Sequence, residues 1–122
     1  MIKYNFFIPG RLPGLNEIIN EARTHKFASA TQKKKYTKRV ADVIRLTFRD
    51  YKPMGRIWVS CIWVEKDRRR DPDNIIAGGK KFLLDGMVKA RLLKQDNWNI
   101  QGFTDTWEVG KEPGVWVEVR EV

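Results

Sequence analysis

The segment that most constrains the fold is Ile57–Glu65, which is nearly continuously apolar and rich in β-branched and aromatic side chains. An edge strand or a half-exposed strand would alternate apolar and polar residues, whereas a continuous run suits a central strand covered on both faces. The segment therefore predicts a sheet with this strand in its interior and other elements packed against it.

The rest of the sequence predicts three further strands and three helices. A strand over residues 2–8 ends at Pro9 and Gly10, and apolar spacing indicates a short helix over 15–22. A polar, basic loop is expected over 23–29, followed by an amphipathic helix over 31–51 with a basic outer side. A further helix spans 73–90, and strands over 100–109 and 115–119 form a hairpin across residues 110–114.

These elements predict one α+β domain over residues 1–122, with a mixed sheet packed with helices. A chain of 122 residues has no room for separate catalytic and substrate-binding domains. Any active site must share the one core or be completed by a second subunit.

The formal charge of +9 predicts a positive field that attracts polyanions, and nucleic acid is the first partner to consider. The plainer alternative is a small basic protein that is simply soluble. Cys61 is the single cysteine and His25 the single histidine, which excludes an internal disulfide and a Cys/His zinc cage. The start of the chain lacks the pattern of a secretion signal, and no run reaches membrane-spanning length, so we expect a cytoplasmic protein.

The most informative segment for chemistry is residues 68–74, where three cations abut two carboxylates just after the predicted central strand. Arginines bind phosphate oxygens in bidentate fashion, and carboxylates supply the hard oxygen ligands that Mg²⁺ prefers. The pattern therefore indicates a site for a phosphate and a metal together. Its members are Arg68, Arg69, Arg70, Asp71 and Asp73.

The helix after this segment places further groups near the site. Pro72 favours a first helical turn, which puts Asp71 at the N-cap, and Asp73 and Lys81 lie on one stripe of the helix. Asp96 falls in a polar loop over 94–99, where the chain could return toward the helix start. A metal bound by such carboxylates would polarise a phosphodiester and lower the pKa of a bound water.

Each residue also has a structural interpretation. Asp71 would be a plain helix cap, Lys80 and Lys81 would belong to a solvated face, and Asp85 would pair with Lys81 across one helical turn. Taken alone, Asp96 is an ordinary loop residue. The acids indicate a site only as a set.

The order Arg69-Arg70-Asp71-Pro72-Asp73-Asn74, then Lys80-Lys81-Phe82-Leu83-Leu84-Asp85-Gly86 and Leu92-Leu93-Lys94-Gln95-Asp96, resembles the RusA family of Holliday junction resolvases. The resemblance implies metal binding by Asp71, Asp73 and Asp96, with Mg²⁺ as cofactor and Mn²⁺ as a substitute. It implies Lys81 as the catalytic lysine, with Lys80 as the fallback because the stretch 75–79 is longer than in the best-known members.

The same resemblance implies a homodimer that nicks opposed strands of a four-way junction and leaves 5′-phosphate and 3′-hydroxyl ends. We expect the DNA to contact a basic set of residues: Arg68, Arg69, Arg70, Lys80, Lys33, Lys34 and Lys35. Trp58, Trp63 and Trp116 could lie at the dimer interface or in the core, and Trp98 could stack on an unpaired base.

Two other functions fit the same residues. A flap-type or less selective nuclease would use the same metal site on a different DNA substrate. A junction-binding module that has lost catalysis would keep the basic surface without the chemistry. A nucleotide-sugar transferase with an Asp-x-Asp metal site is excluded by size, because the chain cannot hold a sugar-nucleotide domain as well.

Overall fold

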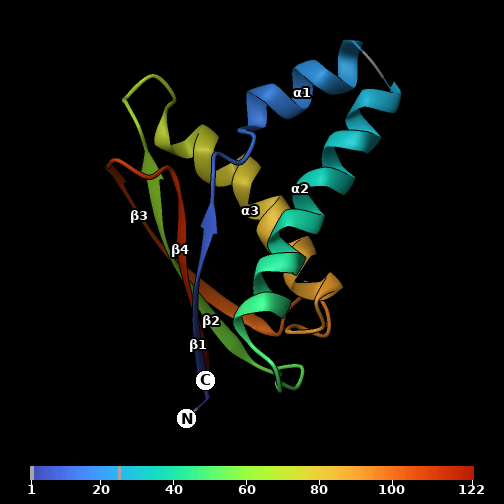
Figure 1. Cartoon of the computed structure of the whole chain (residues 1–122), viewed down its shortest axis with the longest axis vertical. Coiled ribbons are helices and arrows are strands. Elements are labelled where there is room, and N and C mark those ends of the chain that lie inside the picture. Colours follow the sequence, from blue (N-terminus) through green and yellow to red (C-terminus); the bar gives the residue numbers. More distant parts are fainter. Residues whose placement is uncertain (1, 25) are drawn as a thin grey trace.

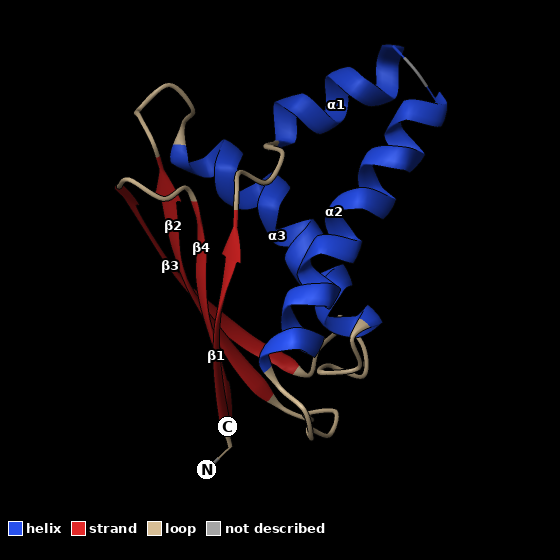
Figure 2. Cartoon of the chain, in the orientation of Figure 1, coloured by secondary structure: helices blue, strands red, loops and turns tan. Residues whose placement is uncertain are grey.

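The structure, a computed structural model, describes residues 2–24 and 26–122 and confirms the predicted single α+β domain with a mixed sheet. Figures 1 and 2 show the helices gathered on one side of the sheet. None of the helices in these residues combines the length and apolar character needed to cross a membrane. The elements in chain order are β1 (Lys3–Pro9), α1 (Leu15–Thr24), α2 (Lys26–Thr47), β2 (Ile57–Glu65), α3 (Pro72–Lys89), β3 (Ile100–Val109) and β4 (Gly114–Glu121).

The sheet has the strand order β1-β4-β2-β3, so β2 lies in its interior as its apolar sequence predicts. The strand β3 runs parallel to β2, with α3 as the crossover, and β4 runs antiparallel to both β1 and β2. The predicted hairpin between residues 100–109 and 115–119 is therefore wrong. Gly110 donates its N–H to the carbonyl of Glu65 (2.9 Å), so the connection crosses the end of β2 and delivers β4 to its other side.

The hydrophobic core lies between the sheet and the helices. Alternate residues of β2 face the helices and are buried, but on the opposite face Ile62 is 40% exposed and Trp116 of β4 is 54% exposed. The prediction that β2 is covered on both faces is therefore wrong, and its outer face is open. Among the tryptophans, Trp63 belongs to the core. The core side chains also include Val59, Cys61, Val117, Val119, Val40, Ile44, Phe82, Leu83 and Met87.

The predicted loop over 23–29 is also wrong, because α1 continues to Thr24 and α2 already begins at Lys26. These residues include no glycine or proline, and Arg23, Lys26 and Ala28 have high helix propensity, so only their polarity indicates a loop. His25 lies outside the described residues. At its other end α2 stops at Thr47, and Tyr51 instead donates its hydroxyl to the carbonyl of Ala90 (2.6 Å).

The glycines of α3 allow its close packing. A Cβ on Gly78 would lie 2.3 Å from the carbonyl carbon of Gly14, and one on Gly79 would lie 2.5 Å from the ring of Trp63. Both distances are well inside van der Waals contact. Close packing therefore explains why glycine occupies both positions in this helix.

Candidate metal and nucleic-acid site

The first turn of α3 presents two carboxylates to solvent. Asp71 occupies the N-cap position with an extended backbone, and Pro72 follows it at the start of the helix, as the sequence predicts. The carbonyl of Asp71 accepts the N–H of Ile75 (3.1 Å), but its carboxylate makes no capping hydrogen bond. Asp73 is exposed beside it. Within the described chain neither carboxylate has an ion-pair or hydrogen-bond partner, so both are free to bind a cation.

The position of this turn is fixed by contacts with the start of α1. Asn74 accepts the backbone N–H of Asn16 through Oδ1 (2.8 Å), and Gly78 lies against the backbone of the segment before α1. The sequence motif contains Asn74, but no role for it was predicted. Since Asn74 follows Asp73 directly, its hydrogen bond orients the turn that carries both carboxylates.

The side chain of Arg70 is largely buried, and its hydrogen bonds stabilise the fold. Its side chain is 9% exposed and donates two hydrogen bonds to the carboxylate of Glu65 (both 2.8 Å), one to the carbonyl of Leu12 (2.8 Å) and one to Glu17 (3.0 Å). Burial opposes its charge, but the carboxylates of Glu65 and Glu17 raise the pKa of its guanidinium. We therefore correct the predicted DNA-binding role of Arg70. Glu65 lies only five residues before it, but Leu12 and Glu17 are more than 50 residues away, so spacing alone did not indicate the full set of partners.

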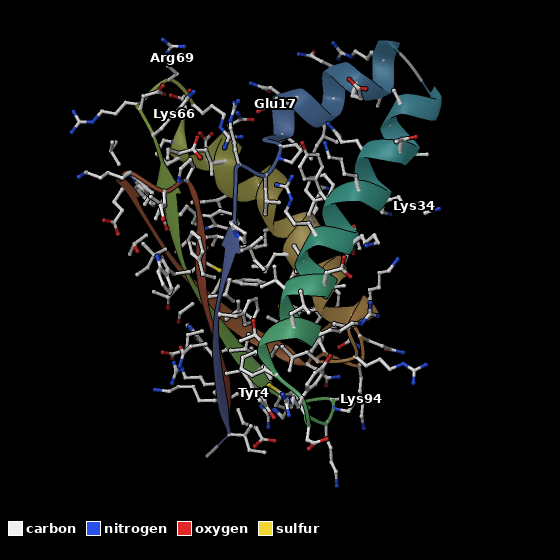
Figure 3. All side chains as sticks on the ribbon, in the orientation of Figure 1. Tyr4, Glu17, Lys34, Lys66, Arg69 and Lys94 are labelled. Carbon is white, nitrogen blue, oxygen red and sulfur yellow. The ribbon has the colours of Figure 1, made fainter. Side chains whose placement is uncertain are left out.

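Arg68 and Arg69 remain exposed in the loop between β2 and α3. Figure 3 shows Arg69 at the tip of this loop, with its side chain directed away from the sheet. Arg69 forms an ion pair with Asp67 (3.6 Å), which is weak because the arginine side chain is 87% exposed. Both arginines can therefore reach a phosphate.

A groove of about 390 Å³ lies beside the start of α3. One wall is apolar, because Trp107 is 55% exposed and Val109 is 50% exposed at the end of β3. The other wall carries Asp71 and Arg68. The groove thus combines an aromatic surface with a carboxylate and a guanidinium. The full lining is Glu65, Asp67, Arg68, Arg70, Asp71, Pro72, Ile75, Trp107, Glu108 and Val109.

The two candidate lysines lie in different environments. Lys80 forms an ion pair with Asp105 of β3 and lies 3.9 Å from the ring centroid of Phe103, and its side chain is 16% exposed. Asp105 also accepts the indole N–H of Trp63 (2.9 Å), so Lys80 joins α3 to the sheet. Lys81 is exposed and has no ion-pair partner among the residues described. Of the two, only Lys81 has an ammonium group free for a substrate.

The structural interpretation of the helix predicts an ion pair between Asp85 and Lys81, and this prediction is wrong. It forms instead an ion pair with Lys33 of α2 (3.9 Å), in which the lysine is 72% exposed. Lys34 and Lys35 are exposed on the same helix, and Figure 3 shows Lys34 directed away from the rest of the molecule. The outer side of α2 is therefore basic, as predicted.

Asp96 lies at the opposite end of α3 from Asp71 and Asp73. Burial and the nearby carboxylate of Asp85 raise its pKa, which places it near that residue. A rise of 1.5 Å per residue separates Asp73 from Asp85 by about 18 Å along the helix. The expected return of the loop over 94–99 toward the helix start is therefore wrong.

The loop over 94–99 does not return toward the helix start because of the turn that follows α3. Arg91 adopts a positive φ of 63°, and the N–H groups of Leu92 and Leu93 both donate to the carbonyl of Met87. Leu92 is fully buried, and its own carbonyl accepts the N–H of Met54 (2.8 Å). The loop is thereby held at the C-terminal end of α3. Among the residues that the structure describes, no three metal-ligating side chains come together in one protomer.

The fold and site define a class of small α+β protein with two free carboxylates on a helix start, beside an aromatic groove and a basic loop. No known family model matches the chain, and no curated protein matches its sequence.

Proposed function

We propose that the protein is a magnesium-dependent, structure-selective endonuclease that resolves four-way DNA junctions, as its resemblance to the RusA family implies. The observation that supports this most is the pair of exposed carboxylates, Asp71 and Asp73, which have no partner among the described residues and lie beside Arg68 on a chain of charge +9. Carboxylate oxygens in a solvent-exposed turn are suitable ligands for Mg²⁺ or Mn²⁺. The free thiol of Cys61 suits the cytoplasm of a bacterial or phage-infected cell.

Each group has a distinct task in phosphodiester hydrolysis. Mg²⁺, when bound by Asp71 and Asp73, supplies a Lewis acid that polarises the phosphodiester and lowers the pKa of an attacking water. Lys81 meets the negative charge that develops on the phosphate, and Arg68 and Arg69 hold the neighbouring phosphates. The lysines of α2 extend the binding surface along the DNA backbone.

One protomer does not contain the complete site. The resemblance assigns Asp96 to the metal, but this residue lies beside Asp85 at the far end of α3. A homodimer removes the discrepancy, because Asp96 of the partner subunit can lie beside the start of α3. We therefore propose that each of two sites takes Asp71 and Asp73 from one subunit and Asp96 from the other.

The test compares cleavage of a synthetic four-way junction with cleavage of a linear duplex of the same arm sequence, in Mg²⁺ and in EDTA. We expect paired, symmetric nicks in the junction only, which disappear with EDTA and in Asp73→Asn. The control is Asp50→Asn, because it makes the same change in charge at an exposed loop residue outside the site and should cut normally.

The outcomes separate the alternatives. Equal cutting of junction and duplex would favour the less selective nuclease, which the open groove beside Trp107 also allows. Junction binding without cutting under Mg²⁺ or Mn²⁺ would contradict the proposed enzyme and favour a binding module.

A further inference from the structure

Three tryptophans of the described chain are more than half exposed, and they lie on different parts of the molecule. Trp116 lies on the outer face of the sheet, and Trp98 lies in the loop that the turn after α3 holds at the C-terminal end of that helix. Trp107 lies on the helix side of β3, where it lines the same groove as Asp71. Of these three indoles, only Trp107 therefore adjoins the proposed metal site.

The sheet fixes the position of Trp107 but leaves its ring available. Its backbone pairs with Trp63 of β2, whose side chain is buried and donates its indole N–H to Asp105 (2.9 Å). The ring of Trp107 contacts no other ring in the described part of the chain, whereas Trp116 packs on Phe7 with ring centroids 4.7 Å apart. A half-exposed indole without an aromatic neighbour can stack on a ligand.

The groove beside Trp107 has the size and lining of a site for a small ring. Its volume of about 390 Å³ lies at the lower end of the range of about 300–1,000 Å³ for ligand sites. Pro72 and the buried Ile75 line it from α3, and Val109 lines it beside Trp107. Aromatic and aliphatic walls of this kind fit the faces of a nucleobase.

The charged groups of the groove suit the phosphate next to such a base. Glu65 and Asp67 are paired with arginines, and Glu108 points to the other face of the sheet because side chains alternate along β3. Arg68 is exposed and has no ion-pair partner among the residues described. The groove therefore offers a phosphate a free guanidinium next to the carboxylate of Asp71.

We infer that the groove binds a nucleobase that has left the DNA base stack, with Trp107 stacked on the base and Arg68 bound to its phosphate. The inference rests on the proposed function and deepens it, because it names the feature of the DNA that the site selects. Base and phosphate belong to one nucleotide, so a base in the groove brings its own phosphate to Asp71.

This mode of binding favours a branch point over a continuous duplex. Inside a duplex the neighbours of each base cover both its faces, so an indole can stack on a base only after the base is unpaired and unstacked. The cost of this step is smallest where pairing or stacking is already interrupted, as at the crossing of a four-way junction. Trp107 therefore supplies a physical reason for selectivity, which the carboxylates alone do not.

The first experiment measures the binding of single strands by fluorescence anisotropy, with Ca²⁺ in place of Mg²⁺. Two labelled strands of equal length are compared, one of thymidines and one of abasic residues, so both present the same phosphates to the basic surface. We expect the wild type to bind the strand with bases at least about fivefold more tightly, the lower end of what one stacked base contributes. This preference should largely disappear in Trp107→Ala.

Matched variants separate stacking from folding. Trp107→Phe keeps a flat ring and should keep most of the preference, whereas Trp107→Leu keeps an apolar side chain without a ring and should lose it. Trp116→Ala removes an indole of equal exposure, 54% against 55%, from the outer face of the sheet and should bind as the wild type does. Circular dichroism identifies a variant that fails to fold, and Trp107→Leu then replaces Trp107→Ala.

The outcomes decide between this groove and the rest of the surface. A wild type without a preference for bases would overturn the inference, and so would a preference that survives in the folded Trp107→Ala or Trp107→Leu variant. Loss of the preference in Trp98→Ala or Trp116→Ala, with Trp107→Ala unaffected, would place the base elsewhere and would also overturn it.

The second experiment tests the same contact during cleavage. In a four-way junction, the nucleotides on either side of each cut are replaced one at a time by an abasic residue. We expect one of these replacements to slow cutting by the wild type at least about fivefold, whereas Trp107→Ala should cut the intact and the abasic junction at one reduced rate. An abasic effect of the same size in both proteins would contradict the inference, because the base would then act at another place.

The two experiments distinguish failure of the inference from failure of the proposed function. If the wild type cuts no DNA, the proposed function fails, but the binding of single strands still decides whether Trp107 stacks on a base. If the wild type cuts the junction and no abasic residue slows it, the base site is wrong and the proposed nuclease is not affected.

Discussion

At the scale of the residue, neighbouring cations of the same type differ in their environment, because some are exposed and others are held in ion pairs. Arg68 and Arg70 are two positions apart, yet Arg68 is exposed and Arg70 is held by Glu65 and Glu17. The adjacent Lys80 and Lys81 differ in the same way. A run of cations shows that a phosphate could be bound, but it does not show which cation is already paired with acids, as Arg70 is with Glu65 and Glu17.

The burial of Arg70 predicts a large effect on stability. In Arg70→Ala the carboxylate of Glu65, 15% exposed, loses its bidentate partner, and breaking such a pair costs about 3 kcal/mol of unfolding free energy. Urea denaturation measures this loss. The matched variant Arg68→Ala should unfold within about 0.5 kcal/mol of the wild type and weaken only DNA binding. Equal stability of the two variants would contradict the assignment of Arg70 to the fold.

Cys61 predicts a pH dependence. Burial, together with the charge of Asp105, raises the pKa of its thiol from 9.0 to about 12. The thiol of the native protein should therefore not react with Ellman's reagent at pH 8 and should react fully in denaturant. Because the folded state keeps a proton that the unfolded chain loses above pH 9, this thiol should lower stability as the pH rises from 9 to about 12. Rapid reaction of the native thiol would show that the core is open.

Single residues also show why the site was only partly predictable. Pro72 and the acid before it fixed the start of α3 correctly, because this signal is local. The position of Asp96 depends on the turn at Arg91, which has a positive φ without a glycine to indicate it. The sequence therefore indicated candidate acids but not their separation.

At the scale of the element, β2 and α3 were predicted almost to the residue, because their patterns are long and end at clear boundaries. The hairpin was wrong because alternation within a strand does not reveal its neighbour. The crossover through α3 puts β3 beside β2 in parallel, and β4 then pairs with the other edge of β2. The loop over 23–29 was wrong because polarity alone does not exclude helix.

The packing of α3 predicts that Gly78→Ala destabilises the protein, although alanine is the better helix former by about 1 kcal/mol. The added Cβ would lie 2.3 Å from the backbone of Gly14, which cannot rotate away as a side chain can. Overpacking of this kind costs typically about 1–3 kcal/mol, which outweighs the gain in helix propensity, so we expect a net loss of up to about 2 kcal/mol in urea denaturation. The control is Gly55→Ala, whose Cβ would meet no atom within 4 Å. A stabilised Gly78→Ala variant would contradict this close contact.

At the scale of the whole molecule, the charge of +9 predicts DNA binding that weakens steeply with salt. Each phosphate contact contributes about −0.9 to the slope of log K against log salt concentration. Replacing Lys33, Lys34 and Lys35 together by alanine should therefore reduce the slope by about 2–3 in fluorescence anisotropy titrations of junction DNA. Lys52→Ala, in the loop after α2, should leave it nearly unchanged. An unchanged slope in the triple variant would exclude α2 from the DNA interface.

The class of the whole fold was predicted correctly because one continuous apolar strand, flanked by helical patterns, allows few other arrangements. The separation of Asp96 from Asp71 and Asp73 could not be predicted, since it depends on how the chain turns after α3 rather than on spacing in the sequence. Function remains a proposal built on Asp71, Asp73 and their surroundings.

The most direct test of the proposed metal site is the binding of Mn²⁺, measured by electron paramagnetic resonance without DNA. We predict saturable binding to the wild type, at least about ten times weaker in Asp73→Asn and unchanged in Asp50→Asn. Binding of Mn²⁺ to Asp73→Asn with the affinity of the wild type would contradict the proposed site.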